Sequence, residues 1–267
     1  MVKRYSMGRY SNIRNTINSQ AQSFGLFIDH RIMQAGISHL FHYVAERGDV
    51  YVFSGIIRNF LLGYLENRDI DFVISMRETL NIPISLLRGT TITKNKFGGV
   101  KIQKNGFNID VWNISSTWGI DARRGIYSPH ALLKTAFFNF SSIVYDYNKR
   151  KFIYDDTFCR FKEYNIVDVV NVANPFPSAC VVNTLHYAAT YEFEIGDKLR
   201  RWIVKHYDHS ADFVSIQKKR YGEVLYDLNT IDEFVKACKA TKNSGEIQIK
   251  ASNGETYRII IHKNIKI

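Results

Sequence analysis

The chain has 267 residues, of which 45% are hydrophobic and 14% aromatic, and this composition indicates a folded protein with a sizeable core. No apolar run is long enough to cross a membrane and no signal-peptide core follows the basic N-terminus, so we expect a soluble cytoplasmic protein. A formal net charge of +11 favours polyanionic partners, nucleic acid first and anionic membrane second, although charge alone identifies neither.

The cysteines exclude a disulfide scaffold and a cysteine-based metal site. They are few, odd in number and not in metal-ligand spacing, so we expect ordinary thiols in a reducing compartment. They are Cys159, Cys180 and Cys238.

The first part of the sequence predicts helices followed by a strand, a turn, a short helix and a second strand. Residues 17–33 show a loose helical pattern, and apolar residues recur at helical spacing between residues 37 and 47. The stretch 50–75 then combines two buried-strand patterns with a small-residue turn. We expect strands over Val50–Phe53 and Asp69–Ile74, a turn at Ser54 and Gly55, and a helix that carries Arg58 and Asn59.

A D-x-D pattern opens the second of these strands. Successive side chains of a strand point to opposite faces, so Asp69 and Asp71 share one face, and two adjacent carboxylates suit a divalent metal. The glycine turn that opens a helix at Gly55 presents N–H groups suited to phosphate. The pattern alone is weak, because two solvated aspartates would look the same, so we treat metal-bound phosphate as a working hypothesis.

A third acid follows on a later strand. Residues 90–93, 100–104 and 107–111 have strand-like composition, and Asn105 and Gly106 between the last two favour a hairpin turn. In the second arm of that hairpin, Asn108 and Asp110 share one face.

The remainder predicts a short buried helix, another hairpin and a largely helical C-terminal half. We expect a domain boundary near residues 159–174, with domains over 1–158 and 159–267. The expected elements are a helix over Leu132–Phe140, strands over Ile143–Tyr147 and Lys151–Tyr154, helices from Pro175 onwards and over Tyr221–Leu228 and Ile231–Cys238, and a terminal hairpin of Glu246–Lys250 and Tyr257–His262.

Together these features resemble the nucleotidyltransferase superfamily, in particular the class II poly(A) polymerases and CCA-adding enzymes. The family pattern G-G-x-V-R-D-x-L-L-G followed by D-x-D is similar to F-S-G-I-I-R-N-F-L-L-G-Y-L-E-N-R-D-I-D-F-V in this chain. The segment H-A-L-L-K-T-A-F-F-N-F resembles the family's R-R-D-F-T-I-N-A, and N-T-L-H-Y-A-A-T-Y-E-F resembles its neck-domain pattern R-A-L-R-F-A-A-R-L-G-F. The resemblance spans residues 50–202.

The resemblance implies an α+β fold with a five-strand mixed palm sheet, followed by a mainly helical neck and C-terminal domain. It implies transfer of a nucleotide from an NTP, ATP or CTP first, with two Mg²⁺ ions. The implied metal-binding and catalytic residues are Asp69, Asp71 and Asp110, and the implied nucleotide-binding residues are Ser54, Gly55, Arg58, Asn59 and Lys134. An arginine at position 58 could equally form a structural ion pair.

Several positions depart from the family pattern. Asn59 replaces an aspartate, Lys134 alone keeps the charge of the R-R-D motif, and Asn183 and His186 stand where arginines are expected. No base-selecting template is evident, since a solvated helix face explains Asp197, Arg200 and Arg201 better. The basic segments Lys198–Lys205 and Lys218–Arg220, interleaved with Trp202, Tyr207 and Tyr221, suit RNA, although ordinary amphipathic helices have the same composition.

We therefore expect a nucleotidyltransferase that acts on an RNA 3′ end, such as that of tRNA. We expect no long helical body of the kind by which CCA-adding enzymes hold tRNA. The small size and the divergent motifs favour a specialised role, such as a tRNA-modifying toxin or a defence component. Two alternatives stay open. The same palm could nucleotidylate a protein or join nucleotides into a second messenger, or the chain could be a degenerate RNA-binding module without catalysis.

Overall fold

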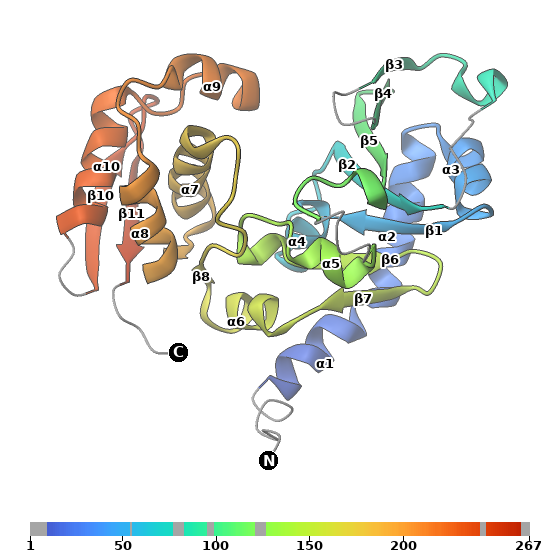
Figure 1. The fold of residues 1–267 in the computed structure, drawn as a ribbon, viewed down its shortest axis with the longest axis horizontal. Coiled ribbons are helices and arrows are strands. Elements are labelled where there is room, and N and C mark those ends of the chain that lie inside the picture. Colours follow the sequence, from blue (N-terminus) through green and yellow to red (C-terminus); the bar gives the residue numbers. More distant parts are fainter. Residues whose placement is uncertain are drawn as a thin grey trace. The chain divides into compact units, whose positions relative to one another are not determined.

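The computed structural model describes residues 10–53, 55–76, 83–94, 99–120, 127–240 and 244–262 (Figure 1). The chain divides into two compact units, unit 1 with residues 1–136 and 140–163 and unit 2 with residues 137–139 and 164–267. The predicted division after residue 158 falls within α6 (Asp156–Tyr164).

Unit 1 contains a seven-stranded mixed sheet in the order β3-β4-β5-β2-β1-β6-β7. β2 and β5 are parallel, and the other neighbouring pairs are antiparallel. The strands are β1 (Asp49–Phe53), β2 (Asp69–Ser75), β3 (Thr91–Lys94), β4 (Val100–Lys104), β5 (Phe107–Asn113), β6 (Ile143–Asp146) and β7 (Lys151–Tyr154).

The mixed sheet confirms the predicted fold class, but the expected number of five strands is wrong. The sheet is wider because hydrogen bonding continues past the expected core at both edges. β3 pairs with β4 at one edge, and the hairpin of β6 and β7 pairs with β1 at the other.

The helices of unit 1 pack on both faces of its sheet, and no helix within the described residues is long and apolar enough to cross a bilayer. Aromatic contacts place α2 and α3 on one face, with the Phe41 and Phe72 ring centroids 4.7 Å apart and those of Phe24 and Tyr145 4.8 Å apart. The helices are α1 (Ser11–Ser19), α2 (Ala21–Gln34), α3 (Ser38–Ala45), α4 (Gly55–Leu61), α5 (Pro129–Leu133) and α6, with 3₁₀ turns η1 (Ile84–Leu87) and η2 (Ile114–Ser116).

The opposite face of the sheet is covered in part by α5. Leu132 and Leu133 of this helix join Tyr51, Val73 and Val144 in one buried cluster. Because alternate residues of a strand share a face, β2 directs Asp69, Asp71, Val73 and Ser75 to the α5 face. Its other residues, Ile70, Phe72 and Ile74, face α2 and α3.

The hairpin of β4 and β5 fixes the position of the third acid. Asn105 and Gly106 have φ angles of 49° and 77°, as a two-residue hairpin turn with both central residues left-handed requires. This turn sets the register in which Lys101 faces Asp110 and Gln103 faces Asn108.

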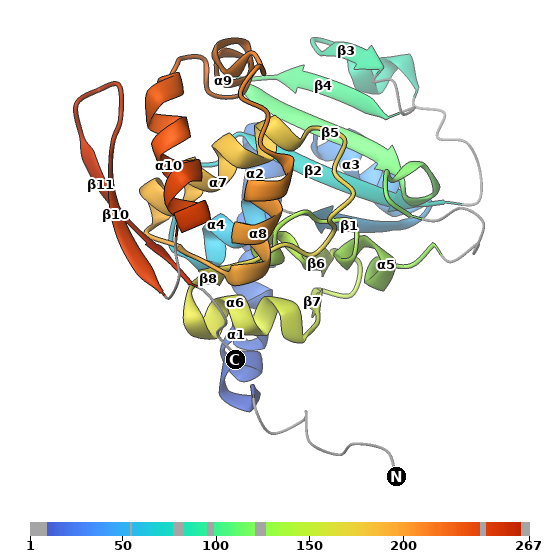
Figure 2. The same ribbon diagram turned by 60° about the vertical axis from the view of Figure 1, so that its left-hand side comes forward.

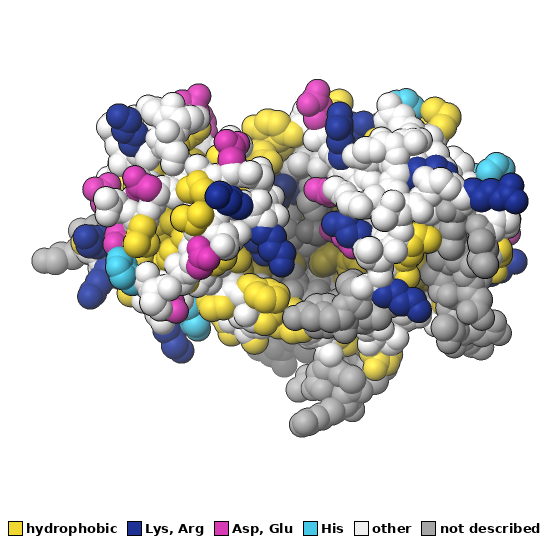
Figure 3. Space-filling view, turned by 90° about the horizontal axis from the view of Figure 1, so that it is seen from above, with side chains coloured by type: hydrophobic (Ala, Val, Ile, Leu, Met, Phe, Trp, Pro, Cys, Tyr) yellow, Lys and Arg dark blue, Asp and Glu magenta, His cyan; other side chains and the backbone are white. Residues whose placement is uncertain are grey.

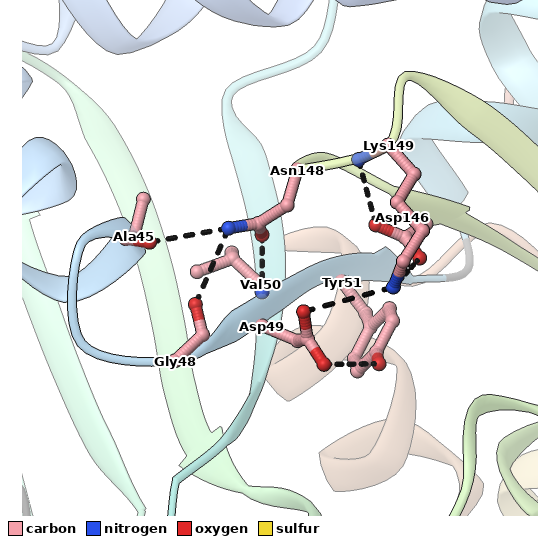
Figure 4. A network of polar contacts seen from close by, with 8 residues as sticks. All are labelled: Ala45, Gly48, Asp49, Val50, Tyr51, Asp146, Asn148 and Lys149. Carbon is pink, nitrogen blue, oxygen red and sulfur yellow. Dashed lines mark hydrogen bonds and ion pairs between the residues drawn. The ribbon is translucent and has the colours of Figure 1, made fainter.

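Asn148, in the turn between β6 and β7, holds the start of β1 (Figure 4). Its Oδ1 accepts a hydrogen bond from Val50 N at 2.8 Å, and its Nδ2 donates to the carbonyls of Ala45 at 3.1 Å and Gly48 at 3.4 Å. Beside it, Lys149 Nζ lies 3.1 Å from Oδ2 of the buried Asp146. These contacts tie the end of α3 and the start of β1 to the edge hairpin.

Replacing Asn148 with alanine is expected to lower the free energy of unfolding by about 1–2 kcal/mol, because the N–H of the buried Val50 loses its acceptor, whereas the exposed carbonyls of Ala45 and Gly48 can bind water instead. Urea unfolding followed by circular dichroism measures this change. Asn12→Ala on the exposed side of α1 is the matched control and should change stability by less than about 0.5 kcal/mol. Equal effects of the two substitutions would contradict the assigned role of Asn148.

Unit 2 combines four helices with a small sheet of order β10-β11-β9-β8. The predicted terminal hairpin is present as β10 and β11, which lie beside α10 (Figure 2). The elements are β8 (Ile166–Val167), α7 (Pro177–Tyr191), β9 (Glu194–Ile195), α8 (Asp197–His206), α9 (Phe213–Tyr221), α10 (Leu228–Ala240), β10 (Gly245–Lys250) and β11 (Thr256–Ile261).

Two predicted helices are wrong in their extent. The helix expected over 132–140 ends at Leu133, and the chain continues through a bridge of Phe138 with Val169 into the 3₁₀ turn η4 (Asn139–Ser141). The helix expected over 221–228 is wrong between its two end residues, because α9 ends at Tyr221, Gly222 follows with a left-handed φ of 84°, and α10 begins only at Leu228. All three cysteines are buried free thiols, as expected.

Candidate active site

The three predicted acids lie on two neighbouring strands of unit 1. In the β2–β5 register Asp71 is opposite Asp110, and Asp69 is opposite Asn108. All four side chains share the face of the sheet that carries Val73. The parallel pairing therefore brings Asp110 to a D-x-D pair that lies about 40 residues earlier in the sequence.

Burial and like charges oppose ionisation of this group. Burial, with the charges of Asp110 and Asp69, raises the pKa of Asp71 to about 7 against a smaller opposing effect of Lys101. Burial also raises the pKa of Asp110, opposed by Lys101 and reinforced by Asp69. The site therefore holds negative charges whose mutual repulsion a bound cation would relieve.

Lys101 of β4 is a site residue that the sequence reasoning missed. It is directly opposite Asp110. Its positive charge opposes the rise in pKa that burial and the neighbouring carboxylates cause at Asp71 and Asp110. The signal was present in the sequence, because a two-residue turn at Asn105 and Gly106 fixes which residues of the two arms face each other.

Two amides follow Asp69 across the sheet. Asn108 Nδ2 donates to Asp69 Oδ1 at 2.8 Å, and Gln103 Nε2 donates to Asn108 Oδ1 at 3.0 Å. Thr91 of β3 lies next in the same cross-strand row.

The donor chemistry fits a hard cation such as Mg²⁺. Among the residues that the structure describes, no three His, Cys, Asp or Glu side chains are already gathered as a metal-holding cluster. Mg²⁺ does not need a closed protein cage, because it keeps several waters and is bound through one or two carboxylates and substrate phosphates. The carboxylates of Asp69, Asp71 and Asp110 are oxygen donors on one face. Burial first, and repulsion between the carboxylates second, raise the pKa values of Asp71 and Asp110, and a bound ion would relieve the repulsion.

Three of the predicted nucleotide-binding residues, Gly55, Arg58 and Asn59, belong to α4. Gly55 is its first residue, whereas Ser54 lies outside the described residues. Arg58 and Asn59 are only 5% and 8% exposed, and Arg58 Nε donates to Asn59 Oδ1 at 2.8 Å. The Arg58 guanidinium carbon also lies 4.8 Å from the Phe140 ring centroid. These contacts hold the Arg58 side chain within the fold, and phosphate binding by this residue stays a prediction.

Lys134 is the residue after the end of α5, and its exposed side chain forms an ion pair with Asp155. Partial burial disfavours the charged form of Asp155, but the hydrogen bond and charge of Lys134, with hydrogen bonds from Thr157, hold its pKa below the usual range. A nucleotide phosphate would therefore compete with this carboxylate for Lys134.

The divergent neck positions make contacts within unit 2. Asn183 accepts a hydrogen bond from the Tyr221 hydroxyl at 2.6 Å, and the ring of His186 lies 4.6 Å from that of Tyr221. Arg200 is 7% exposed and donates to Asp197 and to the Cys238 carbonyl, so a solvated helix face is the wrong description for this arginine.

The basic segments carry exposed cations, but the aromatic residues expected to stack on RNA beside them make contacts within the protein. Trp202 is 5% exposed and donates to the Val172 carbonyl at 3.0 Å. Lys219 and Arg220 of α9 instead line a pocket of about 560 Å³ with Phe176, which is 52% exposed. Figure 3 shows Lys and Arg side chains scattered over one face of the molecule. The position of Phe176 next to Lys219 and Arg220 arises from tertiary packing and leaves no sequence signal.

No protein-family model matches the sequence, and no curated protein sequence matches it. Solved structures match its fold. A tRNA nucleotidyltransferase complexed with a primer tRNA and an incoming ATP analogue matches with a TM-score of 0.51 and 15% identity, covering 72% of this chain and 57% of that one. A tRNA-processing enzyme with CTP matches with a TM-score of 0.52 and 16% identity, covering 77% and 56%.

An apo form of a tRNA-processing enzyme matches with a TM-score of 0.52 and 16% identity over 80% of this chain and 57% of that one. The chain thus spans between half and two thirds of the length of these structures. At such low identity the likeness concerns the fold. The chain has the nucleotidyltransferase fold that its motifs predicted.

Proposed function

We propose that the protein is a metal-dependent nucleotidyltransferase that moves a nucleoside monophosphate from an NTP to the 3′ end of an RNA, tRNA being the first candidate. The observation that carries this proposal is the register that sets Asp69, Asp71 and Asp110 on one face of β2 and β5. The fold shared with a tRNA nucleotidyltransferase supports it.

The reaction joins the 3′-hydroxyl oxygen of the RNA to the α-phosphorus of the NTP. The bond between that phosphorus and the α,β-bridging oxygen breaks, pyrophosphate leaves with the bonding electrons, and the hydroxyl proton is lost. Two bound Mg²⁺ ions would stabilise the attacking and leaving oxygens. Asp69 and Asp71 would hold both ions, and Asp110 would hold the ion at the attacking hydroxyl.

The partners in this proposal are an NTP, with ATP or CTP expected first, and RNA. The solved neighbours include one complexed with a primer tRNA and an ATP analogue and one with CTP. The formal net charge of +11 supports a polyanionic acceptor. A cytoplasmic location is part of the same proposal.

Replacing Lys219 and Arg220 together with alanine is expected to weaken RNA binding by about 5- to 30-fold, because two phosphate-neutralising charges are lost. The slope of log affinity against log salt should fall by about 1–2. Filter binding of tRNA across a salt series measures both quantities. The matched control removes Lys236 and Lys239 from α10, which are exposed and outside this pocket. Equal loss in both variants would assign the effect to net charge alone.

The direct test incubates the protein with each labelled NTP, Mg²⁺ and total RNA, and then locates the label. Label on RNA that disappears in Asp69→Ala/Asp71→Ala supports the proposal, whereas RNA labelling that persists in this variant contradicts it. Label on protein or in a small cyclic or linear product would favour the two other transferase reactions. RNA binding without Mg²⁺ or label, unchanged without Asp69 and Asp110, would indicate a non-catalytic RNA-binding module.

The specialised role as a toxin or defence component is part of the same proposal. Induced expression in bacteria should arrest growth if cellular RNA ends are modified, and the Asp69→Ala/Asp71→Ala variant should not. Normal growth with soluble, active wild-type protein would contradict the toxin role.

A further inference from the structure

Asp69 ends a hydrogen-bonded row that crosses three strands of the sheet. Gln103 of β4 donates to Asn108 of β5 at 3.0 Å, and Asn108 donates to Asp69 of β2 at 2.8 Å. The three residues are cross-strand partners in the β4–β5 and β2–β5 registers, so the backbone itself sets them in line.

The direction of these hydrogen bonds follows from the chemistry of the end group. An ionised carboxylate accepts hydrogen bonds and cannot donate, so the amide of Asn108 must turn its NH₂ group towards Asp69. The Asn108 oxygen then faces β4, where Gln103 can satisfy it only with its own NH₂ group. The row therefore has one consistent polarity, running from Gln103 to Asp69.

The row fixes one oxygen of Asp69 and leaves the other available. Asp69 Oδ1 is held by Asn108, and within the described part of the chain Oδ2 has no hydrogen bond or ion pair. Asp69 itself is exposed, so without this contact its side chain would sample several rotamers in water.

We propose that Asn108 and Gln103 are positioning residues that hold the Asp69 carboxylate ready for a divalent cation. The inference deepens the proposed function, because it rests on Asp69 being a metal ligand. Asn108 acts by fixing Asp69, and Gln103 acts by fixing the amide of Asn108. Mutation of residues that hydrogen-bond to a metal ligand, without binding the metal themselves, commonly lowers metal affinity by about 10- to 100-fold.

The test is a Mn²⁺ titration of the full-length metal-free protein, with free Mn²⁺ followed by electron paramagnetic resonance. Asn108→Ala should weaken Mn²⁺ binding by about 10- to 100-fold and Gln103→Leu by roughly 3- to 10-fold, because the second acts one step further away. Thr91→Ala is the matched control, since Thr91 continues the row without a side-chain hydrogen bond to Gln103 and should leave the affinity unchanged. Metal-free thermal midpoints should agree within a few degrees among all four proteins, because Gln103 and Thr91 are exposed, Asn108 is half-buried, and the hydrogen bonds lost join side chains that water can reach.

A double-mutant cycle separates positioning from a general effect. In an Asp69→Asn background, Asn108→Ala should cause no further loss of Mn²⁺ affinity, because its partner has already been changed. Wild-type affinity in Asn108→Ala, or an equal loss in the Asp69→Asn background, would overturn the inference while leaving the proposed function intact. Absence of Mn²⁺ binding that depends on Asp69 and Asp71 in the wild-type protein would overturn both.

Discussion

Replacing Asp71 with asparagine is expected to lower the rate of nucleotidyl transfer by about 10³-fold or more. The substitution keeps the size of the side chain and removes one negative charge between Asp69 and Asp110. A metal ion that polarises the reacting phosphate is worth several kcal/mol, and a loss of about 4 kcal/mol corresponds to about 10³ in rate. Single-turnover transfer of labelled NMP to RNA, at saturating NTP and Mg²⁺, measures the effect.

Asp156→Asn is the matched control for this experiment. Asp156 is a half-exposed carboxylate of unit 1 that forms an ion pair with Arg14. It follows β7, which lies three strands from β2 in the sheet. Its loss should change the transfer rate by no more than about twofold, since exposed ion pairs contribute little. A similar rate in Asp71→Asn and Asp156→Asn would exclude Asp71 from the chemistry.

The substitution Asp71→Asn is also expected to stabilise the metal-free protein at pH 8. The pKa of Asp71 is raised to about 7 by burial and by the charges of Asp110 and Asp69, whereas in the unfolded chain it has its ordinary value near 3.8. Between these two values the folded state holds more protons, so raising the pH favours unfolding. The shift corresponds to about 4 kcal/mol, which the partial exposure of Asp71 reduces to about 2 kcal/mol.

Urea unfolding in EDTA across pH 4 to pH 8 measures this prediction. The wild-type protein should lose stability as the pH rises towards 7, and Asp71→Asn should lose less and exceed the wild type at pH 8. Addition of Mg²⁺ at pH 8 should stabilise the wild type more than the variant, because the ion relieves the repulsion. Parallel pH profiles for the two proteins would show that Asp71 does not titrate with a raised pKa.

Local patterns in the sequence were sufficient to predict most of the palm. The D-x-D alternation and the Asn105-Gly106 turn determine which residues share a face, and both follow from the period of a strand and the geometry of a two-residue hairpin. The pairing of β2 with β5 has no local signal, because parallel strands meet through a long connection. The prediction that Asp110 joins Asp69 and Asp71 came from the resemblance to known enzymes, because the period of a strand does not show which strands pair.

The errors arose where tertiary packing decides the outcome. Arg58 is buried against Phe140, a contact between residues 82 positions apart that no sequence period reveals, and its role as a phosphate ligand stays a prediction. The helix expected through residue 140 ends early because Phe138 pairs with Val169 in unit 2. The apolar composition of residues 132–140 predicted that they are buried but not where the helix ends.

The most direct measurement of the central claim compares ATP or CTP labelled at the α-phosphate with the same nucleotide labelled at the γ-phosphate. We predict that α-label enters RNA, that γ-label appears only in pyrophosphate, and that the two products form in equal amounts. Labelled RNA and labelled pyrophosphate should both be absent with the Asp71→Asn variant. Transfer of γ-label to any acceptor, or α-label entering RNA at the wild-type rate in Asp71→Asn, would contradict the account.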